Sequence, residues 1–261
     1  MRWEELSGAS FEAAVQSAGG VCILPIGVIE YHGPHLPLGT DTYHCHALAC
    51  AAAEREAAIV FPFYPYGVNS ETMHYPGGIR LRDRLLFDLL ENVCEEISRN
   101  GLKKIVLLSG HGGNRFWLPL FVQLTLDKDC DYTPYYVQGL PVDDEAKAML
   151  ETELHGQACE CETSIEIYLH EHLVHMDALD TSRWWRDQKR LEHLPGVYTP
   201  ADWSARFPEH CAGDPRPANA EKGKALFESE AIALARLIGA IKRDTAAPAV
   251  YREFRSRIYR R

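Results

Sequence analysis

Short apolar runs that alternate with amphipathic stretches constrain the fold of this chain more than any other sequence feature. The clearest run is Lys104–Ser109 (KIVLLS), which lacks the polar alternation of a strand with one face in solvent. Similar runs occur at Val21–Ile26, 58–63 and 132–138. Because such strands are buried on both faces, they are typical of a parallel sheet that helices cover on both sides.

Helical patterns lie between these runs. In residues 84–99, leucine, valine and isoleucine recur three or four positions apart and therefore share one helix face. Further helices are expected at 43–55, 116–126, 142–154 and 218–243. Strands that alternate with helices predict an α/β protein, a three-layer αβα sandwich with a mostly parallel central sheet.

The chain shows no internal repeat and no low-complexity segment, so we expect a single domain over residues 1–261. Residues 176–217 hold Trp, Pro and polar residues with weak periodicity. We interpret this stretch as a structured excursion from the domain, not as a linker.

Charge and cysteine usage exclude several classes of protein. The formal net charge of −10 argues against general binding to nucleic acid or to an anionic membrane. No apolar stretch approaches the roughly 18–20 residues that span a bilayer, and the first ten residues lack the apolar core of a secretory signal. Eight scattered cysteines are too sparse for a disulfide framework, so we expect reduced thiols and a cytoplasmic location.

The segment directly after the first apolar run is rich in potential ligands. In an extended chain, residues two apart point the same way, so Glu30 and His32 would present a carboxylate and an imidazole to one point. Asp41 follows a loop rich in glycine and proline, and its two oxygens could bridge two metals about 3.5–4 Å apart. This segment should lie at the carboxyl edge of the sheet, where α/β proteins build their sites.

A second segment, Ser109-Gly-His111-Gly-Gly-Asn114, follows the third apolar run and should reach the same edge. Glycines beside His111 allow close backbone approach and leave its ring accessible. Mixed His, Asp and Glu ligands suit zinc, iron and manganese. Simpler roles stay open: Asp41 could cap a helix, His32 or His35 could be an ordinary loop histidine, and the glycine-rich loop could hold an anion with its amides.

The first segment resembles the creatininase-family signature Gly-x-x-Glu-x-His-Gly-Pro-His-Leu-Pro-x-x-x-Asp, and residues 109–114 are similar to the second signature of that family. Three further segments match in the same order. They are Tyr66-Gly67 with Tyr75-Pro76-Gly77, Glu162-Thr163-Ser164, and Gly213-Asp214-Pro215 with Glu221-Lys222-Gly223.

The resemblance implies an αβα dinuclear metal amidohydrolase that assembles as a homo-oligomer, usually a hexamer. It implies that Glu30, Asp41 and His111 hold one divalent ion, and that His32 and Asp41 share the second with a further glutamate. Creatininase takes that glutamate from its second signature, where this chain has glycine, so Glu162 is the expected ligand. Zn²⁺ is the expected metal, with Mn²⁺ or Fe²⁺ as alternatives.

Two departures from the family pattern concern catalysis. Gln157 stands where relatives have the histidine proposed as proton donor, and an amide cannot shuttle a proton. We therefore expect Glu160 or His155 to supply the acid. In the YG…FPG loop, the family's Glu-His is Glu71-Thr72 here, with His74 displaced by two positions.

Cys159 and Cys161 flank Glu160, but their spacing is not that of a zinc-ribbon pair and no second cysteine pair completes four ligands. They could instead contact the active-site metal from the side. Trp184 and Trp185 could form an aromatic wall over a substrate, although burial in the core is the commoner role.

The expected function is hydrolysis of a non-peptide C–N bond in a small-molecule amide, such as a cyclic amide or a formamide, by attack of metal-bound hydroxide. The departures from the pattern argue that creatinine is not the substrate. Arg80, Arg82 and Arg115 are candidates for a phosphorylated one. The alternatives are a non-catalytic metal- or ligand-binding protein on the same scaffold and a peptidase-type member.

Overall fold

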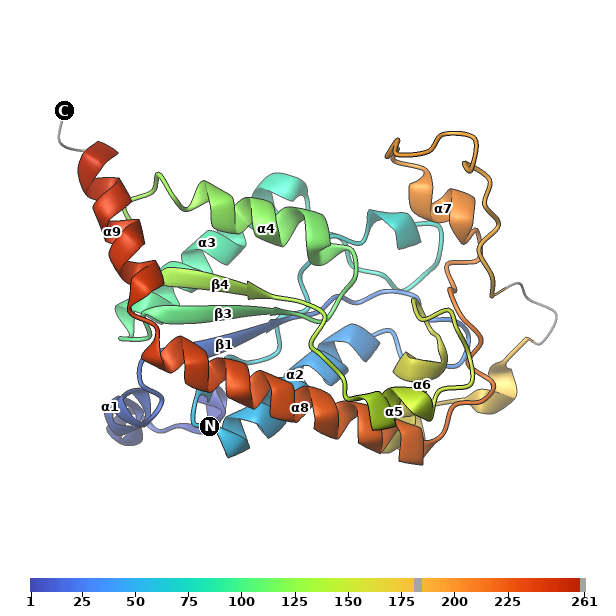
Figure 1. The fold of residues 1–261 in the computed structure, drawn as a ribbon, viewed down its shortest axis with the longest axis horizontal. Helices are drawn as coiled ribbons and strands as arrows, with labels where there is room; N and C mark the ends of the chain where they lie inside the picture. Colours follow the sequence, from blue (N-terminus) through green and yellow to red (C-terminus); the bar gives the residue numbers. More distant parts are fainter. Residues whose placement is uncertain (181–184, 259–261) are drawn as a thin grey trace.

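The computed structural model describes residues 1–180 and 185–258. Its sheet has four parallel strands in the order β2-β1-β3-β4 (Figure 1). Val21 at the start of β1 pairs with Lys104 in β3, and Ile26 at its end pairs with Ser109. The strands are β1 (Val21–Ile26), β2 (Ile59–Val60), β3 (Lys104–Ser109) and β4 (Thr133–Val137). The predicted parallel sheet is confirmed, although β2 is shorter than the apolar run 58–63.

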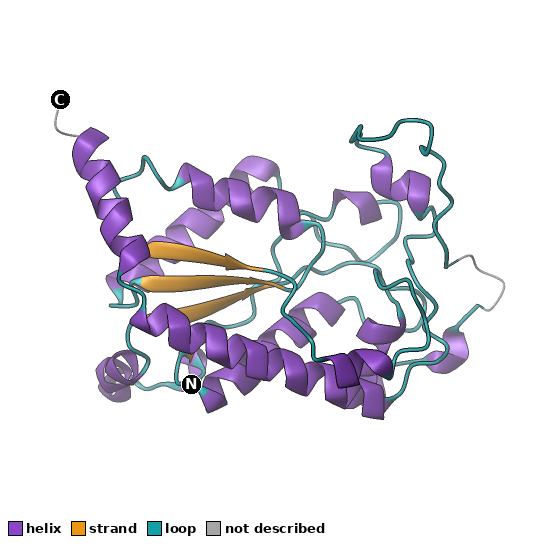
Figure 2. Ribbon diagram, in the orientation of Figure 1, coloured by secondary structure: helices purple, strands orange, loops and turns teal. Residues whose placement is uncertain are grey.

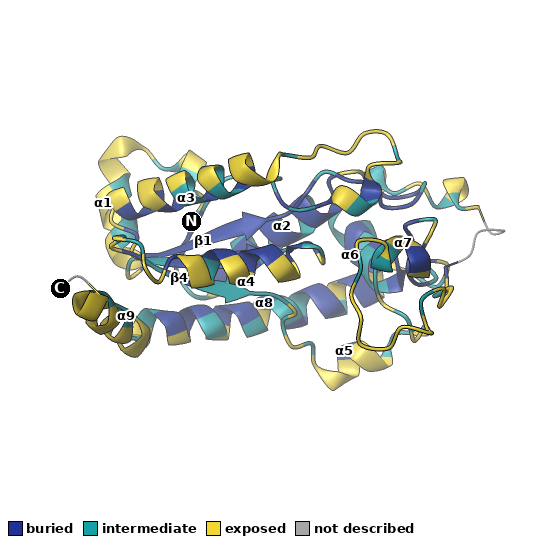
Figure 3. Cartoon of the chain, turned by 90° about the horizontal axis from the view of Figure 1, so that it is seen from above, coloured by how far each residue is buried: buried dark blue, intermediate teal, exposed yellow. Residues whose placement is uncertain are grey.

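Successive side chains of β1 enter opposite helical layers. Ile23 packs into one apolar cluster, whereas Leu24 packs into the other. Figure 2 shows helices on both sides of the strands, and Figure 3 shows the buried sheet between them. The first layer holds α2 (Thr40–Arg55), α6 (Glu160–His170) and α8 (Ala220–Arg243), and the second holds α1 (Gly8–Ser17), α3 (Asp83–Arg99) and α4 (Asn114–Leu124). The αβα sandwich is therefore confirmed.

The remaining elements are short or peripheral. They are the helices α5 (Asp144–Ala148), α7 (Asp202–Arg206) and α9 (Ala246–Ile258), and the 3-10 helices η1 (Trp3–Glu5), η2 (Ser70–Thr72), η3 (Glu171–Leu173) and η4 (Met176–Ala178). α5 is shorter than the expected helix at 142–154, and α6 lies where no separate helix was predicted. Within the described ranges, no helix has the length and apolarity needed to cross a membrane.

All four strands point their carboxyl ends toward the end of the molecule that carries α6 and α7 (Figure 1). Residues 185–217 lie at this end, and Phe207, His210 and Cys211 are buried there, so the described part of the stretch 176–217 is a structured excursion, as predicted. Trp185 is also buried and packs with Leu36 in a small apolar cluster. Trp184 lies outside the described residues.

Candidate metal centre

The loop after β1 carries the first ligand candidates into the protein interior. Glu30 and His32 are fully buried. The backbone N–H of Glu30 donates to the carbonyl of Leu38 at 2.9 Å, and the Thr42 hydroxyl donates to the Val28 carbonyl at 3.0 Å. These bonds fold the loop back against the start of α2, and so bring Asp41 beside Glu30 and His32.

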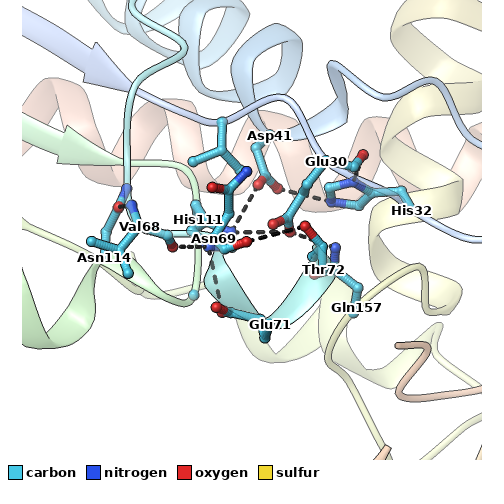
Figure 4. Close-up of polar contacts among 12 residues, drawn as sticks. Glu30, His32, Asp41, Val68, Asn69, Glu71, Thr72, His111, Asn114 and Gln157 are labelled. Atoms are coloured by element: carbon cyan, nitrogen blue, oxygen red, sulfur yellow. Dashed lines mark hydrogen bonds and ion pairs between the residues drawn. The ribbon is translucent and has the colours of Figure 1, made fainter. Parts of the chain in front are cut away.

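Each oxygen of the buried Asp41 carboxylate faces a different histidine (Figure 4). Oδ1 lies 3.0 Å from Nε2 of His32, and Oδ2 lies 2.9 Å from Nδ1 of His111. Ligand-type atoms of Glu30, His32 and Asp41 all lie within 4.8 Å of one another. A carboxylate placed between two imidazoles in this way has the geometry to bridge two cations.

His111 is oriented by the loop that follows β2. Its Nε2 lies 2.9 Å from the carbonyl of Val68, so this nitrogen carries the proton and Nδ1 is available as a ligand. Nδ1 lies 3.3 Å from Oε1 of Glu30. A Cβ atom at Gly113 would lie 2.5 Å from both the His111 ring and the Val68 carbonyl. Glycine is therefore required where the two loops meet.

Oε2 of Glu30 has no hydrogen-bond partner among the described residues, and Oδ2 of Asp41 and Nδ1 of His111 face each other as an ion pair without the geometry of a hydrogen bond. Burial opposes the positive charge of His32 and His111. The carboxylates of Asp41 and Glu30 outweigh this effect and raise the pKa of each histidine to about 10. Burial opposes the charge of Asp41 too, yet the two histidines hold its pKa below its usual range. Buried donor atoms of this chemistry that lack a hydrogen bond fit divalent cations.

Glu162 lies in the first turn of α6, where the charges of His32 and Asp41 act on its carboxylate. Its Oε2 accepts a hydrogen bond from the backbone N–H of Ala158 at 2.5 Å. Burial and the nearby Cys159 raise its pKa well above the usual range, whereas His32 acts in the opposite direction. The side chain therefore lies within the electrostatic reach of His32 and Asp41, and its role as a ligand stays a prediction.

Glu160 and His155, the proton-donor candidates, make contacts of another kind. The carboxylate of Glu160 is buried and accepts hydrogen bonds from Lys222 Nζ at 2.6 Å and from the Thr152 backbone N–H at 2.8 Å. His155 is exposed, and its Nδ1 lies 3.2 Å from the Cys161 thiol. These contacts favour a structural role for Glu160 and place His155 against Cys161. The predicted role of either residue as the proton donor gains no support from them.

Gln157 enters the site through a contact that the sequence did not reveal. Its Nε2 donates to Oε1 of Glu30 at 2.7 Å and to the Tyr31 carbonyl at 3.1 Å. The residue that replaces the family histidine thus holds a candidate metal ligand in place. His35, by contrast, bonds Thr163 at 2.9 Å, and burial with the charge of His32 lowers its pKa to about 4, which fits an ordinary loop histidine.

A cleft of about 590 Å³ opens over His111 and Gln157. Glu71 lines it, with its Oε1 3.9 Å from His111 Nε2. The other wall comes from residues 198–210, including Trp203 and the buried His210, which sequence reasoning missed. No motif marked His210, because its position depends on how the long excursion folds back.

Of the three candidate arginines, Arg115 lines the cleft, whereas Arg80 pairs with Asp83.

Comparisons with known proteins identify the relatives of this chain. The family model Creatininase, described as creatinine amidohydrolase, matches residues 4–238. Creatinine amidohydrolase from Pseudomonas putida is 26% identical over 254 residues, which cover 86% of this chain and 90% of that protein. Mycofactocin precursor peptide peptidase from Mycolicibacterium smegmatis is 34% identical over 113 residues, or 41% of this chain and 45% of that protein.

Solved structures show the same fold. Creatinine amidohydrolase (creatininase) superposes with a TM-score of 0.79 at 24% identity, over 94% of this chain and 98% of that one. A mutant creatininase of Zn-Zn type gives a TM-score of 0.80 at 23% identity, over 93% and 98% of the two chains.

Fold and site together define an α/β protein with a buried histidine and carboxylate cluster of the kind that binds divalent metal ions. The chain belongs to the creatininase family, as the match over residues 4–238 shows. Members of this family are hydrolases that act on C–N bonds, and this chain is assigned to that class of enzyme.

Proposed function

We propose that this chain hydrolyses the C–N bond of a small amide, and that its cofactor is a pair of divalent cations held by Glu30, His32, Asp41, His111 and Glu162. The observation that carries the proposal is the placement of Asp41, whose two oxygens face two different imidazoles. When bound, two such cations lower the pKa of water and stabilise negative charge on a carbonyl oxygen. By analogy with the Zn-Zn creatininase structure, we propose zinc as the metal, with manganese or iron as alternatives.

The residues around the ligands position them. Val68 fixes the tautomer of His111, and Gln157 holds Oε1 of Glu30. Thr42 and Leu38 hold the loop that carries Glu30 and His32. Partners of this kind fix ligand orientation, and their loss typically costs about 10–100-fold in metal affinity or activity.

The substrate proposed is a cyclic amide, a formamide or a related linear amide, and not creatinine. Gln157 and Gly113 occupy two positions where the creatininase pattern has a histidine and a glutamate. The cleft of about 590 Å³ suits a small molecule. Arg115, which lines the cleft, would favour a substrate with an anionic group.

The test is metal-loaded protein screened against creatinine, cyclic amides and formamides, with the Asp41→Ala protein as the matched control. We expect turnover of at least one amide by the loaded protein, none after chelation, and none with the control. Full metal occupancy without any turnover would instead favour the non-catalytic metal-binding alternative.

A peptidase activity is the second candidate. It rests on the local 34% identity to a mycofactocin precursor peptide peptidase. A panel of short peptides, run beside the amides, separates the two candidates.

We also propose that the chain forms a homo-oligomer, a hexamer by resemblance, and that it is located in the cytoplasm. Sedimentation analysis of the purified chain tests the assembly.

A further inference from the structure

His210 is held in the wall of the cleft in an unusual conformation. Only 1% of its surface is exposed, and its backbone φ is +58°, in the left-handed region that side chains other than glycine rarely adopt. Its backbone N–H donates to the Phe207 carbonyl at 3.0 Å, at the end of α7. A buried histidine kept in a costly backbone conformation points to a functional role.

Trp203 fixes the protonation of this histidine. The indole Nε1–H donates to Nδ1 of His210 at 2.7 Å. An indole N–H can only donate, so Nδ1 must accept, and the single proton of the neutral ring lies on Nε2.

The Nε2 atom points toward the candidate metal centre. It lies 3.8 Å from Oε1 of Glu30, and it has no hydrogen-bond partner within the described part of the chain. Two other donors at the cleft are already engaged, since Gln157 bonds Glu30 and His111 bonds Val68. His74 lies exposed against Tyr75.

We propose that His210 is a catalytic residue, a neutral imidazole whose Nε2–H donates a hydrogen bond to the carbonyl oxygen of the substrate as negative charge develops there. The inference rests on the proposed amide hydrolysis and adds a donor that the family pattern does not mark. Preorganised N–H donors in a site sheltered from water stabilise such charge strongly. Trp203 is the corresponding positioning residue.

Acetohydroxamate, an amide analogue that chelates metal, is the probe. Its binding to zinc-loaded protein is measured by calorimetry for the wild type, His210→Phe and Trp203→Phe. We expect about tenfold weaker binding for His210→Phe, as for one lost hydrogen bond, a smaller loss for Trp203→Phe, and unchanged zinc content. Nitrogen NMR of the wild type should place the ring proton of His210 on Nε2.

Binding by His210→Phe within twofold of the wild type, at equal zinc content, would overturn the proposal. So would a proton on Nδ1 of His210, or loss of zinc from His210→Phe, which would make His210 a support for the ligands instead. Failure of the zinc-loaded wild type to bind the probe would overturn the metal centre itself, and His210 with it.

A second, independent cluster lies at the start of α6. The Cys161 thiol is 3.2 Å from Nδ1 of His155, and the ligand atoms of His155, Cys159 and Cys161 all lie within 4.8 Å of one another. Cys159 is 1% exposed, whereas His155 is exposed. The cluster shares no residue with the ligand group of Glu30, His32 and Asp41.

We infer that these three residues form a separate site for one thiophilic cation such as zinc. Tetrahedral zinc with Zn–S bonds of about 2.3 Å separates two thiolates by about 3.8 Å, which the cluster accommodates. Sequence analysis found no second cysteine pair to complete a site with Cys159 and Cys161, because the third ligand candidate, His155, reaches them only through the folded loop before α6. Exposure of His155 leaves the fourth position to solvent, as in zinc sites with three protein ligands.

Cobalt and zinc alone are the probes. The metal-free wild type should take up three zinc ions per chain, whereas the Cys161→Ser protein should take up two and the Asp41→Ala protein one. Cobalt should give thiolate charge-transfer absorption in the wild type and in the Asp41→Ala protein. Cys50→Ser is the matched control, since Cys50 also faces a histidine, His46 at 3.8 Å, and should keep three ions. Two zinc ions in the wild type, or a cobalt–thiolate band that survives in Cys161→Ser, would overturn this inference.

Discussion

Two regions of this protein build the candidate site in different ways. The inner rim consists of the loops after β1 and β3, residues 27–41 and 110–114, and its ligands follow the strand ends directly. The outer wall consists of residues 150–162 and 185–213, and it brings Gln157 and His210 to the rim from far along the chain. Local sequence rules therefore account for the candidate ligands of the inner rim, whereas long-range folding places Glu162 and the residues that would surround a substrate.

The sharpest test of this comparison is loss of Asp41 from the inner rim. Because its two oxygens face His32 and His111, Asp41→Ala should remove both cations of the centre. Several kcal/mol of charge stabilisation would go with them, so we expect at least about a 10³-fold loss of amide hydrolysis. Metal analysis after dialysis and initial rates check this; a variant that keeps both ions and its rate would contradict it.

The ion pair between Glu160 of the outer wall and Lys222 should affect the stability of the fold and not the chemistry of the site. Lys222 lies 2.6 Å from the buried Glu160 and 2.7 Å from Glu151. Removing one partner of a buried ion pair typically costs about 3–5 kcal/mol, so Lys222→Met should lower the free energy of unfolding by about that amount. Denaturant unfolding measures it, with Lys147→Met as the control at an exposed pair.

In the same variant, metal content and the rate per folded molecule should stay near those of the wild type. If Glu160→Gln or Lys222→Met abolished turnover while the protein stayed folded and metal-loaded, Glu160 would return as the proton donor.

Gly113 tests the contact between the inner rim and the loop after β2. A Cβ at this position would lie 2.5 Å from the His111 ring and the Val68 carbonyl, so Gly113→Ala should displace the ligand. We expect about 10–100-fold weaker metal binding, as when a partner of a ligand is lost. Titration with zinc measures it. Gly8→Ala is the control, because a Cβ at Gly8 meets no atom within 4 Å and its backbone is not in the left-handed region; it measures the general effect of replacing a glycine.

The stability of the metal-free protein should depend on pH. The pKa values of His32 and His111 are raised from 6.5 to about 10, chiefly by Asp41 and Glu30 against the effect of burial. Their stabilising contribution is complete below about pH 6.5 and is lost as pH rises toward about 10, because the folded state binds the extra protons. Cations displace these protons, so metal binding strengthens over the same range.

Thermal unfolding in chelator, at about pH 7 and about pH 9, measures this dependence. The midpoint should fall with pH in the wild type, and much less in Asp41→Ala. A midpoint that rises with pH in chelator would contradict the assigned pKa shifts.

The sequence predicts the inner rim because each step depends on neighbouring residues. β1 and β3 are uninterrupted apolar runs, and parallel strands bring the residues after Ile26 and Ser109 to one edge. The outer wall could not be predicted in this way. The partners of Glu160 and His155, and the left-handed backbone of His210, depend on contacts between distant segments.

An anomalous-scattering map of crystals of the zinc-loaded protein shows directly whether two cations lie beside Asp41. At this centre we expect two metal peaks about 3.5–4 Å apart, bridged by Asp41, with His32 on one ion and His111 on the other. A map without metal between these two imidazoles, under conditions that load the protein with zinc, would contradict this arrangement.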